Sequence, residues 1–308
     1  AVNPTTGGND LDTPDRKGWL YRSDARTGTV IWNRRIDNYN GANGSFSRSS
    51  PAVAGPMLYI ADSIPGVSPD RRAHVMAINR HTGQLRWITP INVHPSASIT
   101  QSPLVVNDRI YVGISSTESF VESTLADDDS CSFRGSKVAL DRQNGDVIRQ
   151  TIMIADGFAT PHEYSGASVW GRNPSVDLQR EVIYVPTGQN YSVPERMREC
   201  ERQRRMSPNP ELEPSCIEPT VNMANSITAL DLDTGAVVWN QHLEGYDAWN
   251  FSCGALGQAP GDNPGACPDP AGPDFDFAQG PILWSFPDVP WRWWSRRQIL
   301  LAAQKSGV

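Results

Sequence analysis

The chain lacks the features that mark several large classes of protein. "QILLAA" (298–303) falls far short of the ~20 apolar residues that a membrane-spanning helix needs. The first residues, "AVNPTTGGND", have neither the charged nor the apolar region of a signal peptide, so we expect such a segment to be absent or already removed. No C-x-x-C pair occurs, which argues against a zinc ribbon or an attached c-type haem. G-x-S-x-G, H-E-x-x-H and phosphate-binding glycine loops are also missing.

Positive charge is in short supply. Lys and Arg number 27 against 34 Asp and Glu, for a formal net charge of −7. Nucleic acids and acidic membranes require a basic face, so the balance argues against both partners. The Arg-rich run "ERMRECERQRR" (195–205) does not change this, because its Glu residues interleave with the arginines and predict a short, solvated, ion-paired helix.

Cysteines are few, and their spacing is informative. Cys200/Cys216 and Cys253/Cys267 each bracket a polar loop rich in proline, where a short disulfide closes the loop. We therefore predict two local disulfides and an oxidising compartment, with Cys131 left over. The alternative is a cytosolic protein with five reduced cysteines.

The 308 residues include 10 Trp, 25 Gly and 25 Pro, with few uninterrupted helical patterns. This composition favours many short strands joined by turns, in an all-β sandwich or propeller. The aromatic cluster "WRWW" (291–294) is interpreted as part of a packed strand.

An internal repeat organises the chain. Each copy predicts an alternating strand, a polar turn with Thr-Gly or Asn-Gly, and a second strand that ends in Trp in three copies. The copies are "WLYRSDARTGTVIW" (19–32), "HVMAINRHTGQLRW" (74–87), "SKVALDRQNGDVIR" (136–149) and "SITALDLDTGAVVW" (226–239). The terminal tryptophans are predicted to pack between neighbouring sheets.

Further strand pairs lie between these hairpins. They are predicted in 49–62, 101–114 and 167–188. One hairpin of each kind makes a four-stranded antiparallel sheet, and sheets recurring every ~45–60 residues are typical of a β-propeller. We predict one propeller domain over 1–308, with 191–224 as a loop insertion within a blade.

These segments resemble a known family. The hairpin "ALDLDTGAVVW" (229–239) is similar to the tryptophan-docking motif of dehydrogenases that depend on pyrroloquinoline quinone (PQQ). Four blocks resemble the branch that is similar to polyvinyl alcohol dehydrogenase: "SCSFRGSKVALD", "YSGASVWGRNPSVD", "VPTGQNYSVP" and "GPDFDFAQGPILW". The resemblance implies an eight-bladed propeller, of which about five blades' worth is present, incomplete at the C-terminal side.

The resemblance also implies a cofactor site. PQQ is a flat tricyclic tricarboxylate, so its site needs an aromatic floor and cationic or hydroxyl partners. Trp170 corresponds to the tryptophan that stacks on the cofactor, and Lys305 to the basic residue beside the reactive quinone oxygens. Ser115 and Thr100 match cofactor contacts, and Arg48 is a candidate for the acidic edge.

A calcium ion is implied beside the quinone. Calcium prefers several hard oxygen ligands. Glu118 falls at the metal-binding Glu of the family, and Gln189, with Asn190 beside it, falls at the metal-binding Asn. Lanthanide-dependent relatives carry an additional Asp two residues after the base, whereas position 252 is Ser, which favours calcium. Position 130 is Ser, so Cys131 has no adjacent cysteine for the vicinal disulfide of many relatives.

The catalytic base is left open by the sequence. The methanol dehydrogenase branch carries H-D-x-W-D, with the last Asp as base, and the corresponding text is "YDAWN" with Asn250 at that place. An amide is a poor proton acceptor. Either Asp247 takes over, or the base comes from elsewhere, or this copy is inactive.

Two functions follow. The first is a periplasmic or secreted quinoprotein dehydrogenase that oxidises primary or secondary alcohols, polymeric ones among them, and passes electrons to a cytochrome c. The second is a non-catalytic propeller of the same kind that binds a protein or a small molecule. The oligomeric state is not indicated.

Overall fold

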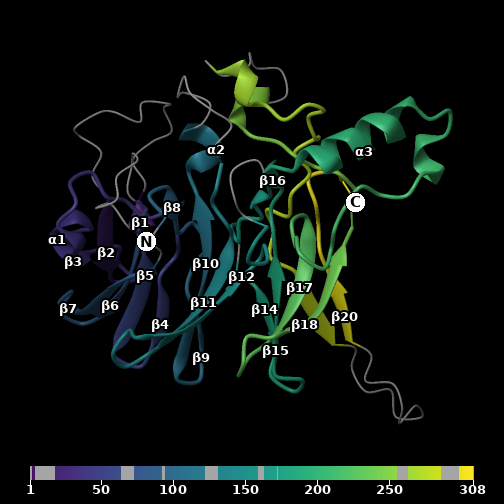
Figure 1. The fold of residues 1–308 in the computed structure, drawn as a ribbon. Coiled ribbons are helices and arrows are strands. Elements are labelled where there is room, and N and C mark those ends of the chain that lie inside the picture. Colours follow the sequence, from purple (N-terminus) through teal and green to yellow (C-terminus); the bar gives the residue numbers. More distant parts are fainter. Residues whose placement is uncertain are drawn as a thin grey trace, which may run out of the picture.

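The computed structural model describes residues 2–3, 18–63, 73–91, 94–121, 131–158, 163–171, 173–243, 245–254, 263–285 and 298–307. The cluster at 291–294 lies outside these residues. The described part consists mainly of antiparallel sheets that follow one another in chain order, from the purple sheet at β2 to the yellow one at β20 (Figure 1). The predicted all-β architecture is confirmed.

Five sheets of sequence-adjacent strands can be followed. The first sheet contains β1 (Val2–Asn3), β2 (Trp19–Ser23) and β3 (Val30–Arg35). The second contains β4 (Ala52–Ala54), β5 (Met57–Ala61), β6 (His74–Asn79) and β7 (Leu85–Pro90). The third contains β8 (Ala97–Ser98), β9 (Leu104–Val106), β10 (Arg109–Ser116), β11 (Ser136–Asp141) and β12 (Val147–Ile152).

The fourth sheet has the order β14 (Ser175–Asp177), β15 (Val182–Pro186), β17 (Ser226–Asp231) and β18 (Val237–His242). The fifth contains β19 (Ile282–Ser285) and β20 (Gln298–Leu301), and a short ribbon pairs β13 (Ser165–Gly166) with β16 (Asn190–Ser192). Every predicted strand pair is present. The segment 191–224 runs between β15 and β17, which are neighbours in one sheet.

The turns of the repeated hairpins form for a local reason. In the fourth copy the Asp231 carboxylate accepts hydrogen bonds from the backbone N–H groups of Asp233 (3.0 Å) and Thr234 (2.6 Å). The hydrogen bond from the Thr234 N–H is the largest reason why the pKa of Asp231 is lowered. Gly235 then adopts φ +73°, which residues with a side chain resist. Asp24, Asn79 and Asp141 close the other three turns in the same way.

The predicted docking of tryptophans between sheets is confirmed for two copies. Trp32 lies against Gly83 in the next hairpin and donates its indole N–H to Arg80 O (3.1 Å). Trp87 lies against Gly145 in the hairpin after that. Apolar clusters fill the spaces between successive sheets, so the core is a series of layers and not a single centre.

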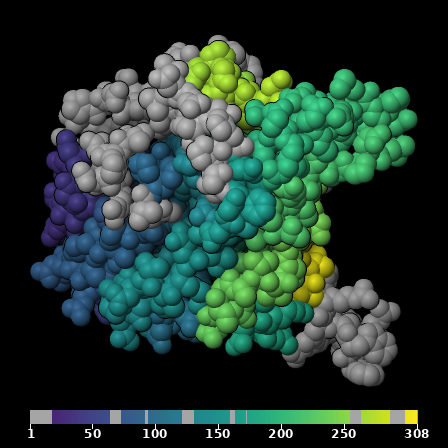
Figure 2. Space-filling model, in the orientation of Figure 1, coloured from purple at the N-terminus to yellow at the C-terminus, as the bar shows by residue number. Residues whose placement is uncertain are grey.

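Helices occupy the connections. They are α1 (Asp37–Asn40), α2 (Glu118–Val121), α3 (Glu195–Met206) and the 3₁₀ turns η1 (Pro210–Leu212), η2 (Phe251–Cys253) and η3 (Pro264–Ala266). Of the helices described, none is long and apolar enough to cross a membrane. Helix α3 and the residues after it stand out from the body of the molecule (Figures 1 and 2).

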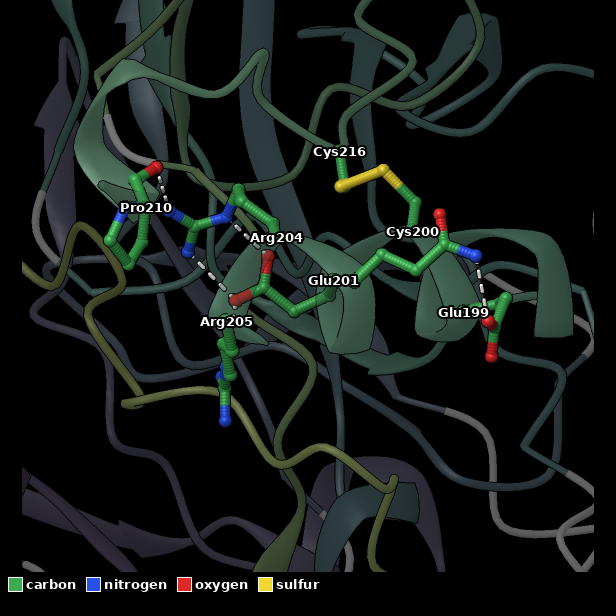
Figure 3. Close-up of a disulfide and its surroundings, with 8 residues drawn as sticks. Glu199, Cys200, Glu201, Arg204, Arg205, Pro210 and Cys216 are labelled. Atoms are coloured by element: carbon green, nitrogen blue, oxygen red, sulfur yellow. Dashed lines mark hydrogen bonds and ion pairs between the residues drawn. A yellow bond between two sulfur atoms is a disulfide. The ribbon is translucent and has the colours of Figure 1, made fainter. Parts of the chain in front are cut away.

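Helix α3 is the ion-paired helix that the sequence predicts. Its buried Glu201 accepts hydrogen bonds from Arg204 (2.7 and 2.8 Å) and Arg205 (2.8 Å), as Figure 3 shows. Burial opposes the charge of Glu201, but the two guanidinium groups outweigh it and lower the pKa of that carboxyl. Cys200–Cys216 joins the helix to the following loop, and Cys253–Cys267 is also formed. Both predicted disulfides are confirmed, and Cys131 is buried and takes part in neither of them.

The helix also contacts the chain ahead of the fifth sheet. Arg202 donates to Asp269 O (2.9 Å) and Arg205 to Ala271 O (3.0 Å). Tyr246, in the stretch after β18, donates its hydroxyl to Pro270 O (2.8 Å). The segment 269–271 is therefore held between α3 and the stretch that follows β18.

Candidate active site

Backbone hydrogen bonds bring together the end of β10, the segment before β14 and the residues after β15. Val169 N donates to Ile114 O (3.0 Å), so the segment before β14 lies beside the end of β10. Gly188 N donates to Ser168 O (2.9 Å), so the residues after β15 also lie beside the segment before β14. The loops that carry most of the predicted site residues thus meet at one end of the third and fourth sheets.

The same chain of contacts extends to the fifth sheet. Phe277 N donates to Thr187 O (3.3 Å), and Lys305 N donates to Asp276 O (3.2 Å). Residues 276–277 and 305 therefore join the residues after β15, although they are distant in sequence.

Trp170, Asp276 and Lys305 form a compact group. The indole N–H of Trp170 donates to Asp276 Oδ2 (2.9 Å). Lys305 Nζ lies 2.9 Å from Asp276 Oδ1 and 5.5 Å from the centroid of the Trp170 ring. The carboxylate is almost fully buried, and it fixes the orientation of both predicted cofactor contacts.

Two further carboxylates surround this group. Lys305 Nζ also donates to Asp274 (3.0 and 3.1 Å). Asp247 Oδ1 accepts from Asp274 N (2.9 Å), and its Oδ2 accepts from Phe275 N (2.8 Å) and Asn225 Nδ2 (2.6 Å). Asp247 thus shapes the loop that carries Asp274 and Asp276.

The electrostatics follow from burial around a single ammonium group. Burial raises the pKa of Asp276 to about 6, although Lys305 acts to lower it. Burial likewise raises the pKa values of Asp247 and Asp274. Burial opposes the charge of Lys305, but Asp276 and Asp274 outweigh it and raise its pKa. A buried carboxylate beside a persistent cation is the arrangement expected for proton transfer near neutral pH.

A glycine leaves room beside the indole. A Cβ on Gly188 would lie 3.0 Å from Nε1 and 3.3 Å from Cδ1 of Trp170, and 3.5 Å from Asp276 Oδ2. A glycine here lets the backbone lie close to the edge of the indole, beside the Asp276 carboxylate. A half-buried indole with an ammonium group over its ring fits a flat anionic aromatic such as PQQ.

Predicted contacts Thr100 and Ser115 lie together. Thr100 Oγ1 is 3.3 Å from Ser115 Oγ, which is 3.2 Å from Ser98 Oγ. Hydroxyl groups in such a cluster can donate to a carboxylate. Arg48 is exposed in the segment before β4, in the second sheet.

Glu118, the predicted metal ligand at the start of α2, is already engaged. Its carboxylate accepts from the backbone N–H groups of Ser132 (2.9 Å) and Phe133 (3.0 and 3.2 Å), and His94 Nε2 lies 3.3 Å away. The carboxylate therefore holds the chain that follows Cys131 against α2.

The two amides predicted beside it differ in their surroundings. Asn190 exchanges hydrogen bonds with Asn222 (2.8 and 3.2 Å) and donates to Ser165 O (2.9 Å). Gln189 is buried, and its backbone carbonyl accepts from Ala167 N (2.9 Å). A carboxylate with amide oxygens has the hard-oxygen chemistry that calcium prefers. Within the described ranges, however, no group of three or more His, Cys, Asp or Glu side chains is arranged to hold a metal ion.

Asn250 has a structural environment. Its side chain caps η2 by accepting from Ser252 N (2.9 Å), and it donates to Ala266 O (2.8 Å) and Tyr191 O (3.3 Å). It is fully buried. These contacts join the loop of the Cys253–Cys267 disulfide to the end of β16.

Asp274 and Asp276 are site residues that the sequence analysis did not single out. They lie in "GPDFDF", directly ahead of β19. Arg48, Thr100 and Trp170 occupy the corresponding stretches ahead of β4, β9 and β14. The position within the repeat was therefore the signal that could have identified them.

Successive antiparallel sheets, with the hairpin of one docked against the turn of the next, define the chain as part of a β-propeller. The model of the PQQ_2 family, described as outer membrane protein assembly factor BamB, matches residues 4–241. The match covers more than half of the chain, so the chain belongs to this family. This confirms the predicted membership of a PQQ-dependent, alcohol dehydrogenase-like group.

Similar proteins of known function are longer. The chain is 27% identical to polyvinylalcohol dehydrogenase of Sphingopyxis sp. (strain 113P3) and 26% identical to that of Pseudomonas sp., over 99% of this chain in both cases. It spans 41% of the length of each of these relatives.

Solved structures support the propeller fold. Quinohemoprotein alcohol dehydrogenase ADHIIG from Pseudomonas putida HK5 matches with a TM-score of 0.57 at 18% identity, over 94% of this chain and 38% of that one. The enzyme from Comamonas testosteroni gives 0.56 at 17% identity, over 95% and 39%. A europium-containing methanol dehydrogenase gives 0.52 at 15% identity, over 94% and 46%.

Proposed function

We propose that this chain forms part of a PQQ-dependent dehydrogenase that oxidises primary or secondary alcohols, with polymeric alcohols among its substrates. The observation that carries the proposal is the group of Trp170, Asp276 and Lys305, in which a buried carboxylate is fixed between an indole N–H and an ammonium group. The polyvinylalcohol dehydrogenases that resemble the chain over nearly all its residues support the choice of substrate class.

In this proposal Asp276 is the proton acceptor. With a pKa of about 6, its carboxylate is mainly ionised at neutral pH and can take the hydroxyl proton of an alcohol. Asp247 does not take this role, because its oxygens accept hydrogen bonds from Asn225 and from two backbone N–H groups. Asn250 does not take it either, because its side chain caps η2.

The remaining residues bind and orient the cofactor. Trp170 supplies the aromatic floor, Lys305 neutralises anionic oxygens, and Thr100 and Ser115 donate to carboxylates, with Arg48 at the outer edge. When bound, the quinone supplies the acceptor for the hydride that leaves the carbinol carbon, while the hydroxyl proton passes to Asp276. The alcohol would thereby become a carbonyl compound, having lost a hydride and a proton, which amount to two electrons and two protons.

The proposal has three further parts. A calcium ion is held by Glu118 with Gln189 or Asn190. Electrons pass to a cytochrome c, and the protein is periplasmic or secreted. The two disulfides support an oxidising compartment. The chain has no C-x-x-C-H haem attachment sequence, which supports an acceptor outside it.

The test is reconstitution of the full-length protein with PQQ and calcium. We expect cofactor absorbance and dye-linked oxidation of secondary alcohols and polyvinyl alcohol. Asp276→Asn keeps the shape of the side chain, so it should retain the cofactor while turnover falls by roughly 100-fold or more.

Asp274→Asn is the matched control, because Asp274 also contacts Lys305 but has no described bond to Trp170. It should lose much less activity than Asp276→Asn. If Asp247→Asn, and not Asp276→Asn, abolishes turnover in a folded protein, the assignment of the base is wrong.

The second function is a non-catalytic propeller, and the description of the matching family as an assembly factor favours it. It predicts no PQQ absorbance and no turnover with any alcohol, together with retained partner binding in Trp170→Ala and Lys305→Ala.

A further inference from the structure

The third repeat departs from the others at Lys137, the second residue of β11. The second residue of the equivalent strand is Leu20 in β2, Val75 in β6 and Ile227 in β17, and all three are buried. Lys137 is only 3% exposed. The fold therefore fills this position with an apolar side chain elsewhere and with an amine here.

The surroundings of the amine are uncharged in the part of the chain that is described. Lys137 Nζ donates to Gln101 Oε1 (2.5 Å) in the segment before β9. Gly113 on β10 and Thr151 on β12 are its partners across the sheet. Val169, in the segment before β14, packs over Gly113. Burial alone therefore lowers the pKa of Lys137 to about 7.

The amine lies next to the candidate cofactor site. Gln101 directly follows Thr100, and Val169 directly precedes Trp170. Side chains two residues apart on a strand share a face, so Ser115 emerges on the same face of β10 as Gly113. A Cβ on Gly113 would come within 2.8 Å of Gln101 Oε1, which shows how closely these segments pack.

A buried ammonium group without a counter-charge is costly, and a hydrophobic side chain of similar volume is usually at least as stabilising. The three sister positions show that the fold does not require an amine here. Its charge is therefore explained best by a ligand that brings the missing negative charge.

We propose that Lys137 is a cofactor-binding residue that provides a buried positive charge for a carboxylate of the anionic quinone. The proposal rests on the function proposed above. The site would then have two cations. Lys137 is contributed by β11 of the third sheet, and Lys305 follows β20.

Protonation then becomes linked to binding. Below pH 7 the amine already carries its proton, so affinity is independent of pH. Above pH 7 the amine must take up a proton when the anion binds, and the affinity falls by up to about tenfold per pH unit. Asp276, with a pKa of about 6, titrates mainly below this range, and Lys305, whose pKa is raised, titrates above it.

The experiment titrates PQQ into the full-length protein with calcium, between pH 6 and pH 9, and follows cofactor absorbance. Lys137→Leu copies the first repeat, and Lys137→Met preserves the length of the side chain. Both variants should bind PQQ about tenfold or more weakly at pH 6.5, with a flat dependence above pH 7. Both apoproteins should melt at the same temperature as the wild type or higher. Arg142→Met removes an exposed charge at the turn of the same hairpin and should change neither quantity.

The outcomes are distinguishable. If the wild type binds PQQ and the two Lys137 variants bind it equally well with the same pH dependence, the inference is wrong and the proposed function stands. A fall in melting temperature in both variants would indicate a structural role and also overturn it. If the wild type does not bind PQQ at all, both proposals fail.

Discussion

The contacts between successive sheets are built in two chemically different ways. At the first contact Trp32 is 8% exposed and covers Gly83, and at the second Trp87 covers Gly145. At the third contact the equivalent residue is Arg149, which covers Gly235. The same backbone geometry therefore accommodates either a tryptophan or an arginine side chain at this position.

The arginine contact is polar throughout. Arg149 donates to the backbone carbonyls of Leu232 and Asp233 at the turn of the next hairpin. Tyr111 OH also donates to Leu232 O (2.9 Å), and Arg109 donates to it as well (2.8 Å). Thr151 donates to Gly235 O (2.8 Å), just as Thr89 donates to Gly145 O (2.8 Å) at the preceding contact.

The comparison shows which parts of the repeat are required. The glycine at the turn and the direction of the docking side chain are common to all three contacts, whereas the chemistry of that side chain varies. Apolar contacts are stabilised by burial, and the polar one by charge-assisted hydrogen bonds that exclude water from the turn carbonyls.

The largest effect is expected for Trp32→Ala. Removing a buried indole leaves a cavity between the first and second sheets, so the free energy of unfolding should fall by about 3–5 kcal/mol. Urea unfolding of the full-length protein measures it. A loss below about 1 kcal/mol would show that the docking residue does not join the sheets.

A smaller effect is expected for Gly145→Ala. Its φ is +82°, and a Cβ would lie 2.6 Å from the Trp87 ring, so strain and overpacking together should cost about 2–4 kcal/mol. Gly28→Ala is the matched control, with φ +73° and no described atom within 4 Å of the new Cβ. It should cost only about 1–2 kcal/mol. Equal losses in the two variants would mean that docking does not crowd the turn.

Arg149→Ala should lower the free energy of unfolding by about 1–3 kcal/mol, because the turn carbonyls lose their charged donor. Tyr111 and Arg109 remain as donors to Leu232 O, which limits the loss. The same urea experiment checks it. A loss as large as that of Trp32→Ala would contradict the distinction drawn between the two kinds of contact.

The smallest effect is expected for Asp233→Ala. The ion pair of Asp233 with Arg109 spans 2.6 Å, but the Asp233 side chain is 77% exposed. Such a pair contributes about 0–1 kcal/mol, and salt screens it. Unfolding at low and high ionic strength should show the difference between variant and wild type shrinking as salt rises. A difference that is independent of salt would point to a role other than ion pairing.

Local chemistry made much of the fold predictable. Asp231 and its equivalents satisfy their own turns within three residues, and α3 pairs its charges within one or two helical turns. The disulfides close short loops with sequence separations of 16 and 14. Contacts of this kind join residues that are close together in the sequence, so they can be predicted from the sequence.

The site depends on contacts between distant segments. Asp276 binds Trp170 across 106 positions, and nothing near Asp276 in the sequence indicates that partner. Asn250 was assessed by its place in a motif, whereas its hydrogen bonds to Tyr191 and Ala266 depend on how the loops pack. The predicted metal and cofactor roles of the other residues remain predictions.

Lys137 illustrates a third case. Its difference from Leu20, Val75 and Ile227 is visible when the repeats are aligned. Its burial is not, because a lysine at the start of a strand can direct its ammonium group to solvent. A comparison of repeats therefore identifies the anomaly, and the packing shows that it matters.

The support that α3 gives to the segment 269–271 has a consequence for maturation. Arg202 and Arg205 hold that segment from a helix that is itself anchored by Cys200–Cys216, and the segment leads directly to Asp274 and Asp276. Reduction of this disulfide is therefore expected to loosen the helix and, with it, the loop that carries Asp274 and Asp276. A chain produced in a reducing cytosol would contain the same residues, but this loop would lack the support of the disulfide.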